Sequence, residues 1–471
     1  MLPLVEFPQI VQHYAPWFET VFSPEALVQF QRYLGGLIIS ENKTVDGINR
    51  LFVIDSRNQS SLNRLLTASP FSEAALNQQR LALLNSLNGT QLKPKGVLSV
   101  DDTLLTHYGR HFDEIACLYD PVDDRYTWAH NLVNLHYSDD RTDYPLQFQL
   151  WHPADLDTIE QGLQAAGIRL REGKFALKES DPKKWRHAKR LLGVWSRNQG
   201  KPEVAALYQS KLWIVRDLLR QWVNQNPQWK LPVTFDNWYT QPAFCRFLDQ
   251  ELELPYVGTL AADNQVVLKK GRLSLEQFAK ELKQEHLEAV ASGGKPVFHK
   301  IGIAYKGEKD TYYSYCRTHR IHNFGKQRLV INFDEPDLSG SPSFYNSNRL
   351  IWQSVGITRI RRHRWSVEVY HEEGKAEGLD KYQVRDFQAI SRHIGLVAVA
   401  YSLLRATPHD EALLHKLQRQ LELDLEGSTP FWRRVSQAQS LWALACFISV
   451  GLTQGQSLRE LMAPLLAAVC A

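Results

Sequence analysis

The segment RRHRWSVEVYHEEGK, residues 361–375, decides how the rest of the chain is interpreted. Read as one helix, it places Arg364, Glu368, His371 and Lys375 on a single stripe about 60° wide, because they are separated by four, three and four residues. A carboxylate flanked by cationic and imidazole groups suits a site that holds phosphate and a divalent metal together. The alternative is a solvated helix face with ion pairs between residues four apart. Taken alone, the segment favours the solvated face.

The composition indicates a soluble cytosolic protein of about two to four domains, without a strong overall charge. The 471 residues carry a formal net charge of +4 and five scattered cysteines, a pattern that argues against a disulfide framework or a zinc site. The first residues, MLPLVEFPQI, lack the features of a signal peptide. The apolar run 441–452 is too short to span a bilayer and predicts a buried helix. We therefore expect a cytoplasmic location and no membrane contact.

The pattern of predicted elements divides the chain into five regions. Residues 1–95 predict a self-contained helical unit, which suits either DNA reading or simple packing. Residues 96–262 and 346–408 alternate strands and helices and predict an α/β core in two parts. Residues 263–345 are rich in β-branched, aromatic and basic residues and predict a β-rich insertion that faces DNA. Residues 409–471 predict a helical C-terminal region for packing or dimer contacts.

Two acidic positions follow apolar strands in the predicted core. VLSVDDT (97–103) reads as a strand that ends in two carboxylates, and VTF (233–235) is followed directly by Asp236. Each aspartate could equally be a loop residue that caps the next segment. Asp101 and Asp102 are adjacent, so their side chains must point to opposite sides of a strand. Of the two, Asp102 is the predicted site residue.

The two aspartates and Glu368 together predict a metal site. In a sheet of mixed direction, the strand-end acids and the acid of a later helix meet at one edge, where three carboxylates need cations to coexist. Oxygen ligands suit two Mg²⁺ or Mn²⁺ ions, which can promote an in-line displacement at a phosphodiester. Arg364 and Lys375 would hold nearby phosphates. This combination outweighs the solvated-face interpretation.

The same residues resemble a known family, the bacterial insertion-sequence DDE transposases with a ribonuclease-H-like core. The resemblance covers about residues 100–400. It lies in VDDT with Asp102, VTFDNWY with Asp236, and the spacing R-(3)-E-(6)-K of Arg364, Glu368 and Lys375, within the family signature Y-(2)-R-(3)-E-(6)-K. The family's tyrosine is replaced by Arg361, which can contact a phosphate electrostatically.

The resemblance implies a fold, an activity and partners. The expected fold is a ribonuclease-H-like mixed sheet with flanking helices, and the expected activity is cut-and-paste transposition of DNA. Asp102, Asp236 and Glu368 would hold two metal ions, and His371 would assist them. The implied partners are the inverted repeats at the transposon ends, target DNA and a second copy of the chain. A DDE nuclease that does not integrate and a catalytically silent DNA-binding repressor are the alternatives.

Overall fold

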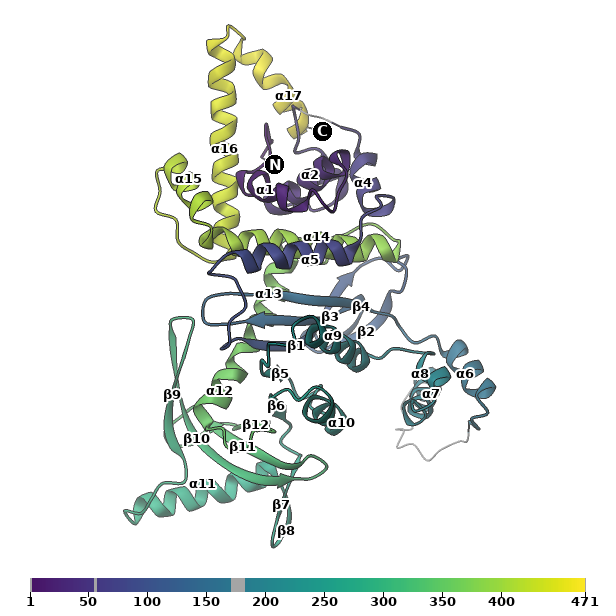
Figure 1. The fold of residues 1–471 in the computed structure, drawn as a ribbon, viewed down its shortest axis with the longest axis vertical. Coiled ribbons are helices and arrows are strands. Elements are labelled where there is room, and N and C mark those ends of the chain that lie inside the picture. Colours follow the sequence, from purple (N-terminus) through teal and green to yellow (C-terminus); the bar gives the residue numbers. More distant parts are fainter. Residues whose placement is uncertain (1, 55–56, 171–182, 471) are drawn as a thin grey trace.

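The computed structural model describes residues 2–54, 57–170 and 183–470. One mixed sheet of twelve strands runs through the middle of the molecule, with helices on both sides (Figure 1). This arrangement agrees with the predicted mixed α/β fold and is consistent with a ribonuclease-H-like core. Nine neighbouring pairs in the sheet are antiparallel, and two are parallel.

The central strands determine where the acidic residues lie. The strand order is β4–β3–β1–β5–β6, with antiparallel pairing from β4 to β1 and parallel pairing from β1 to β6. In the β1–β5 pair Val100 is opposite Phe235, so Asp101 and Asp236 follow at the same level. The strands are β1 (Val97–His107), β2 (Ala116–Asp120), β3 (Arg125–Ser138), β4 (Asp143–Trp151), β5 (Val233–Phe235) and β6 (Tyr256–Leu260).

Two features of this core differ from the sequence prediction. β1 continues to His107, so the aspartate pair lies within the strand and not at its end. The strand continues because β3 pairs with it along its whole length, from Val97 opposite Ser138 to His107 opposite Trp128. The short strand β2, which also pairs with β3, was not predicted. Asp236 therefore follows the fifth strand of the chain and not the fourth.

The predicted β-rich insertion extends the core sheet. β12 pairs with β6 of the core, and β11 and β10 follow outward from it. The insertion has its own small hydrophobic cluster, which includes Phe278 of α11 and Tyr315 of β10. Its elements are β7 (Gln265–Leu268), β8 (Gly271–Ser274), α11 (Leu275–Ala291), β9 (His299–Tyr305), β10 (Glu308–Ile321), β11 (Gly325–Phe333) and β12 (Ser343–Ser347).

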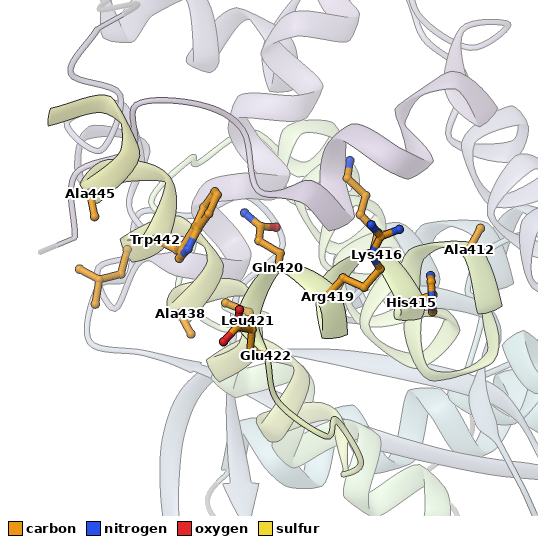
Figure 2. A pocket seen from close by; sticks show the side chains of 11 residues that line it. Ala412, His415, Lys416, Arg419, Gln420, Leu421, Glu422, Ala438, Trp442 and Ala445 are labelled. Atoms are coloured by element: carbon orange, nitrogen blue, oxygen red, sulfur yellow. The ribbon is translucent and has the colours of Figure 1, made fainter. Parts of the chain in front are cut away.

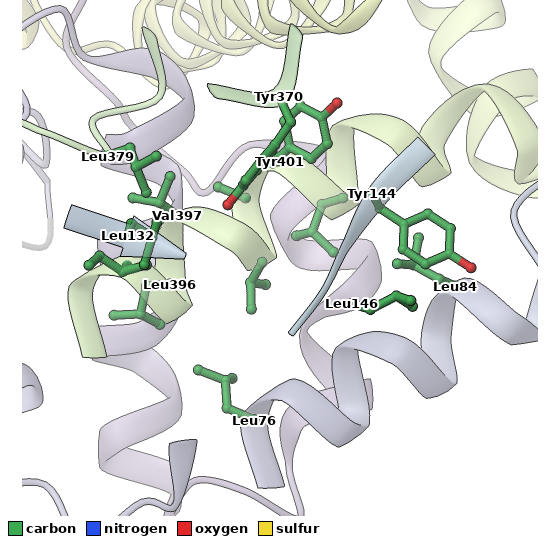
Figure 3. Packing of buried hydrophobic residues seen from close by; sticks show 14 of the residues in the cluster. Leu76, Leu84, Leu132, Tyr144, Leu146, Tyr370, Leu379, Leu396, Val397 and Tyr401 are labelled. Carbon is green, nitrogen blue, oxygen red and sulfur yellow. The ribbon is translucent and has the colours of Figure 1, made fainter. Parts of the chain in front are cut away.

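The N-terminal helices share one hydrophobic core with the sheet. Leu76 and Leu84 of α5 lie in the same cluster as Tyr144 and Leu146 of β4 and Val397 of α14 (Figure 3). The first 95 residues are therefore not a self-contained unit, because α14 and α5 lie side by side against the sheet. The helices are α1 (Gln9–Tyr14), α2 (Pro24–Ile39), α3 (Val45–Asn49), α4 (Gln59–Thr67) and α5 (Glu73–Ser86).

The opening segment 361–375 forms parts of two consecutive helices. α12 (Ser354–His363) ends one residue before Arg364, and α13 (Trp365–Ala376) begins one residue after it. Val97 of β1 packs against Ile357 and Ile360 of α12, which fixes α12 on one face of the sheet. The long apolar helix that follows is α14 (Phe387–Ala406), and it is almost completely buried.

The chain between β4 and β5 forms a smaller group of helices at the side of the core (Figure 1). Its cluster brings together Ile159 and Leu163 of α6 with Leu191 and Trp195 of α7. Across the sheet from α12, Leu218 and Trp222 of α9 pack into the main core. The bounds are α6 (Leu156–Ala165), α7 (Lys183–Arg197), α8 (Pro202–Ala205), α9 (Lys211–Gln225) and α10 (Pro242–Arg246).

The C-terminal helices correct one expectation from the sequence. The run 441–452 is part of α16 (Thr429–Thr453), where Leu441 is 58% exposed and Trp442 is 47% exposed. The helix projects from the body of the molecule (Figure 1), so most of this run is not buried. By length and composition, α14 extended to His409 and α16 could each cross a membrane, although α14 is a core helix. The neighbours of α16 are α15 (Glu411–Leu421) and α17 (Leu458–Cys470).

Candidate active site

The two adjacent aspartates of β1 face opposite sides of the sheet. Asp102 accepts a hydrogen bond from Nζ of Lys211, the first residue of α9, so the even-numbered residues in this part of β1 face α9. Ser99 donates a hydrogen bond to the backbone carbonyl of His363 (3.5 Å), so the odd-numbered residues face α12 and α13. Asp101 therefore points towards α12 and α13, and Asp102 points towards α9.

Asp101 and Glu368 are joined by one arginine. Nη1 of Arg364 lies 2.6 Å from Oδ2 of Asp101, and Nη2 of the same guanidinium donates to Oε1 of Glu368. The position of Arg364 between α12 and α13 lets its side chain reach both the strand and the first turn of α13. The Arg364 side chain is only 12% exposed, which makes this a partly desolvated three-residue group.

Asp236 lies beside Asp101 at the end of the parallel strand pair. Its Oδ1 accepts hydrogen bonds from the backbone N–H groups of Trp238 (3.0 Å) and Tyr239 (3.1 Å), which fixes the turn after β5. Burial raises the pKa of Asp101 to about 7; Arg364 opposes this rise, and the negative charges of Asp102 and Asp236 add to it. Asp101 is therefore a buried carboxyl group whose ionised form is disfavoured mainly by desolvation, even with Arg364 beside it.

Asp102 has a separate set of partners on the other face of the sheet. Its oxygens accept from Nζ of Lys211 (2.8 Å), the hydroxyl of Tyr239 (2.6 Å) and Nδ2 of Asn131 (2.7 Å). Burial acts to raise the pKa of Asp102, but Lys211 and the hydrogen bonds hold it below its usual value. Burial and Asp102 raise the pKa of Tyr239 well above its usual value, so Tyr239 remains a donor. The structure groups Asp101, and not the predicted Asp102, with Arg364 and Glu368.

The predicted phosphate-binding residues differ in their relation to the acids. Arg361 donates from Nε to Oγ1 of Thr259 (2.8 Å). Burial and the neighbouring Arg364 lower the pKa of Arg361, while Glu368 and Asp236 act against this shift, so these carboxylates are nearby. Lys375 lies seven residues beyond Glu368, which is about 10 Å along a helix. Arg361 and Arg364 therefore lie beside Asp101, Asp236 and Glu368, whereas Lys375 lies further along α13.

His371 points into the core. Nε2 accepts a hydrogen bond from Nδ2 of Asn134 on β3 (2.9 Å), and the residue is 7% exposed. Burial lowers the pKa of His371 to about 3, with His136 and Lys375 adding to the shift. The imidazole is therefore neutral at physiological pH and is held by the sheet. The predicted stripe divides, because Arg364 and Glu368 face the acids whereas His371 packs inward.

The donor set fits a divalent cation. Asp101, Asp236 and Glu368 offer only carboxylate oxygens, which Mg²⁺ and Mn²⁺ prefer. Within residues 2–54, 57–170 and 183–470, no three His, Cys, Asp or Glu side chains are arranged around one metal position. Arg364 occupies the place between Asp101 and Glu368 and neutralises them. Burial keeps the pKa of Asp101 raised even with Arg364 beside it, so a cation bound next to Asp101 would favour its ionised form.

Several residues of the site were not predicted from the sequence. Lys211 begins an amphipathic helix, and its contact with Asp102 joins positions 109 residues apart. Tyr239 lies three residues after Asp236, close enough in sequence to be suspected. Asn131 was part of a predicted strand without a distinguishing pattern. The pairing of β1 with β3 and β5, together with the packing of α9, brings these residues together.

A groove of about 940 Å³ lies away from the acids, between α15 and α16 (Figure 2). Its lining includes Lys416 and Arg419 of α15 and Leu441 and Trp442 of α16. None of Asp101, Asp102, Asp236 and Glu368 contributes to it. Asp101, Asp236 and Glu368 thus lie outside this groove.

The comparison with protein families agrees with this site. The chain belongs to the DDE superfamily endonucleases, whose family model matches residues 18–284, more than half of its length. The matched region includes Asp101, Asp102 and Asp236, and it ends before Glu368. A search of curated proteins found no match. Membership supports an enzyme of the transposase and nuclease class that cleaves DNA, and DDE-type endonucleases generally use divalent metal ions.

Proposed function

We propose that this chain is a DNA transposase of the insertion-sequence type, which cleaves the ends of its element and joins them to target DNA. One observation carries the proposal. Asp101 and Asp236 lie at the same level after the paired residues of the parallel strands β1 and β5, and Arg364 links Asp101 to Glu368. Membership of the DDE superfamily endonucleases supports the same reaction class. The spacing R-(3)-E-(6)-K around Glu368 supports the insertion-sequence origin.

Asp101, Asp236 and Glu368 would hold two Mg²⁺ or Mn²⁺ ions in this proposal, with Asp101 in place of the predicted Asp102. When bound, the ions would supply activation of the attacking hydroxyl and stabilisation of the leaving oxygen at the phosphodiester. Asp102 instead orders the site from the other face, because it fixes Lys211 and Tyr239 beside the turn that begins at Asp236.

The cations near the acids would bind the DNA backbone. Arg364 now neutralises Asp101 and Glu368, and a phosphate is an equivalent partner for its guanidinium. Arg361 lies beside it, and Lys375 would contact phosphates further along α13. The exposed cations Lys300 and Arg317 of the insertion would extend this contact. Two transposon ends would require two copies of the chain, and the bacterial cytoplasm or nucleoid would be their location.

Cleavage and joining can be tested with DNA that flanks the gene. Purified protein with Mg²⁺ is expected to nick a supercoiled plasmid that carries the flanking inverted repeats and to join the freed 3′-hydroxyl to a second plasmid. Glu368→Ala is expected to abolish both steps and to retain DNA binding in a mobility-shift assay. Loss of both binding and cleavage would instead indicate misfolding, which a thermal melt detects.

The same assay separates the alternatives. Nicking without joined products would indicate a DDE nuclease that does not integrate. Binding to the repeats without nicking, by the unmodified protein with Mg²⁺ or Mn²⁺, would indicate a silent DNA-binding repressor. The transposase proposal requires both products, and both must depend on Glu368.

A further inference from the structure

The insertion sends one long hairpin back to the helix that carries Glu368. β9 and β10 form it, with Tyr305 opposite Glu308 and a two-residue turn at Lys306 and Gly307. Both turn residues have positive φ, 48° and 87°, as a tight hairpin turn requires. Glycine supplies this conformation at one position, whereas Lys306 adopts it despite its side chain. The backbone of the tip therefore has the defined conformation of a two-residue hairpin turn.

Tyr305 at the tip contacts the junction of α12 and α13. Its hydroxyl is hydrogen-bonded to Oγ of Ser366, two residues before Glu368, and both residues are buried. Its ring packs edge-on against His363, with 4.8 Å between ring centroids. His363 in turn lies against Ser138 of β3, with 3.0 Å between Nδ1 and Oγ. The tip is thus in contact with residues on both sides of Arg364.

Lys306 inserts its ammonium group beside a buried carboxylate of the core. Nζ contacts Oδ2 of Asp143, whose side chain is 2% exposed. Asp143 is also bound by Arg405 of α14 and by the hydroxyl of Tyr401 (2.9 Å). Burial acts to raise the pKa of Asp143, but Arg405 and Lys306 hold it well below its usual value. The tip is therefore attached to the first residue of β4 by an ion pair whose carboxylate is buried and whose ammonium group is partly exposed.

The sides of the hairpin are attached to α12 as well. Nε of Arg362 lies 2.9 Å from Oδ2 of Asp310, and its Nη2 lies 3.3 Å from Oε2 of Glu308. The guanidinium also stands over the ring of Tyr305, with Cζ 5.7 Å from the centroid. Because Arg362 is two residues before Arg364, the hairpin holds the end of α12 from outside while the sheet holds it from inside.

We propose that the tip of the β9–β10 hairpin is a positioning clamp that sets the orientation of Arg364 and Glu368 towards Asp101 and Asp236. Tyr305 and Lys306 contact Ser366, His363 and Asp143 and not the three acidic residues of the site, so they act through the α12–α13 junction. The clamp makes the alignment of Glu368 depend on the hairpin, because Tyr305 at its tip contacts Ser366, which lies 61 residues later in the sequence. The expected effect of the clamp on cleavage rests on the proposed function, whereas its expected effect on the backbone of α13 does not.

Lys306→Met and Tyr305→Phe test the clamp, and Lys309→Met is the matched control. Lys309 is exposed on the same hairpin and makes no ion pair within the part of the chain that the structure describes. Asp143 retains Arg405 in Lys306→Met, so that variant is expected to fold. Single-turnover nicking of the plasmid with flanking DNA is expected to fall on the order of tenfold in both clamp variants. DNA affinity is expected to stay unchanged.

Two further readouts separate positioning from general damage. Backbone amides of α13 are expected to exchange hydrogen faster in Lys306→Met and at the unmodified rate in Lys309→Met. Lys306→Arg, which retains the charge, is expected to restore most of the nicking rate.

The clamp is overturned if both variants nick at the unmodified rate and α13 exchanges normally. It is also overturned if Lys306→Met and Lys309→Met lose DNA affinity equally, because the hairpin would then act as a DNA contact. Unmodified protein that fails to nick, or nicking that survives Glu368→Ala, would refute the proposed function. The exchange of α13 would still decide on the clamp.

Discussion

Replacing the carboxylate of Asp101 is expected to stabilise the protein while it removes cleavage. Asp101 is largely desolvated, its side chain 15% exposed, and it is flanked by two other carboxylates. Burial, Asp102 and Asp236 raise its pKa from 3.8 to about 7, against the effect of Arg364. The Asp101→Asn substitution removes the charge and preserves the shape of the side chain, so it isolates this electrostatic strain.

The magnitude follows from the two pKa values. A carboxyl group with a pKa of 3.8 when unfolded and about 7 when folded opposes folding by up to about 4 kcal/mol at pH values above 7. Asparagine would not recover all of this, because Arg364 would keep Glu368 as its only charged partner. We expect a net gain of about 1–3 kcal/mol in the free energy of unfolding.

The sign of the pH dependence is specific to a raised carboxyl pKa. Below about pH 4 the group is protonated in both states, so Asp101 and asparagine should be nearly equivalent. Between about pH 4 and 7 the unfolded chain ionises before the folded one, so the protein with Asp101 loses stability as pH rises. Above the folded pKa of about 7 the difference is complete and constant. The gain in Asp101→Asn should therefore appear at pH 8 and be smaller at pH 5.

Urea unfolding at pH 5 and pH 8, in a chelating buffer, measures this difference. Asp102→Asn is the matched control with the opposite expected sign, because it would leave Lys211 and Tyr239 without their carboxylate partner. That loss should cost about 1–3 kcal/mol at pH 8. The reasoning is refuted if Asp101→Asn is destabilising at pH 8, or if its effect is the same at both pH values.

Mg²⁺ is expected to raise the Tm of the unmodified protein in a calorimetric scan, and Glu368→Gln is expected to remove most of the rise; equal shifts in both proteins would show that Glu368 is not a ligand. Arg364→Met is expected to weaken DNA binding and to reduce the salt slope of the affinity by about one phosphate contact; an unchanged slope in a salt titration would contradict that role. Asp143→Asn is expected to destabilise the fold by about 3–5 kcal/mol, because Arg405 and Lys306 would lose their buried counter-charge; a urea midpoint within error of the unmodified protein would refute this.

The core strands and the order of the acids were accessible from the sequence because they depend on local patterns. β-branched and apolar runs marked β1, β3 and β4, and an acid directly after VTF marked Asp236. Which of Asp101 and Asp102 joins Glu368 was not accessible from the same pattern. That choice depends on which helix covers which face of β1, and α9 and α12 are more than 100 residues away from the strand.

The helical stripe illustrates the same limit within one short segment. A helical wheel gives the angles between Arg364, Glu368 and His371 but not the direction in which the sheet lies. The helix is also interrupted at Arg364, between α12 and α13. The guanidinium of Arg364 therefore reaches Asp101 from a junction and not from a regular helix turn. His371 then packs against Asn134 of β3, because α13 crosses the sheet there. The apparent row of functional groups is therefore divided between chemistry at the end of α12 and packing along α13.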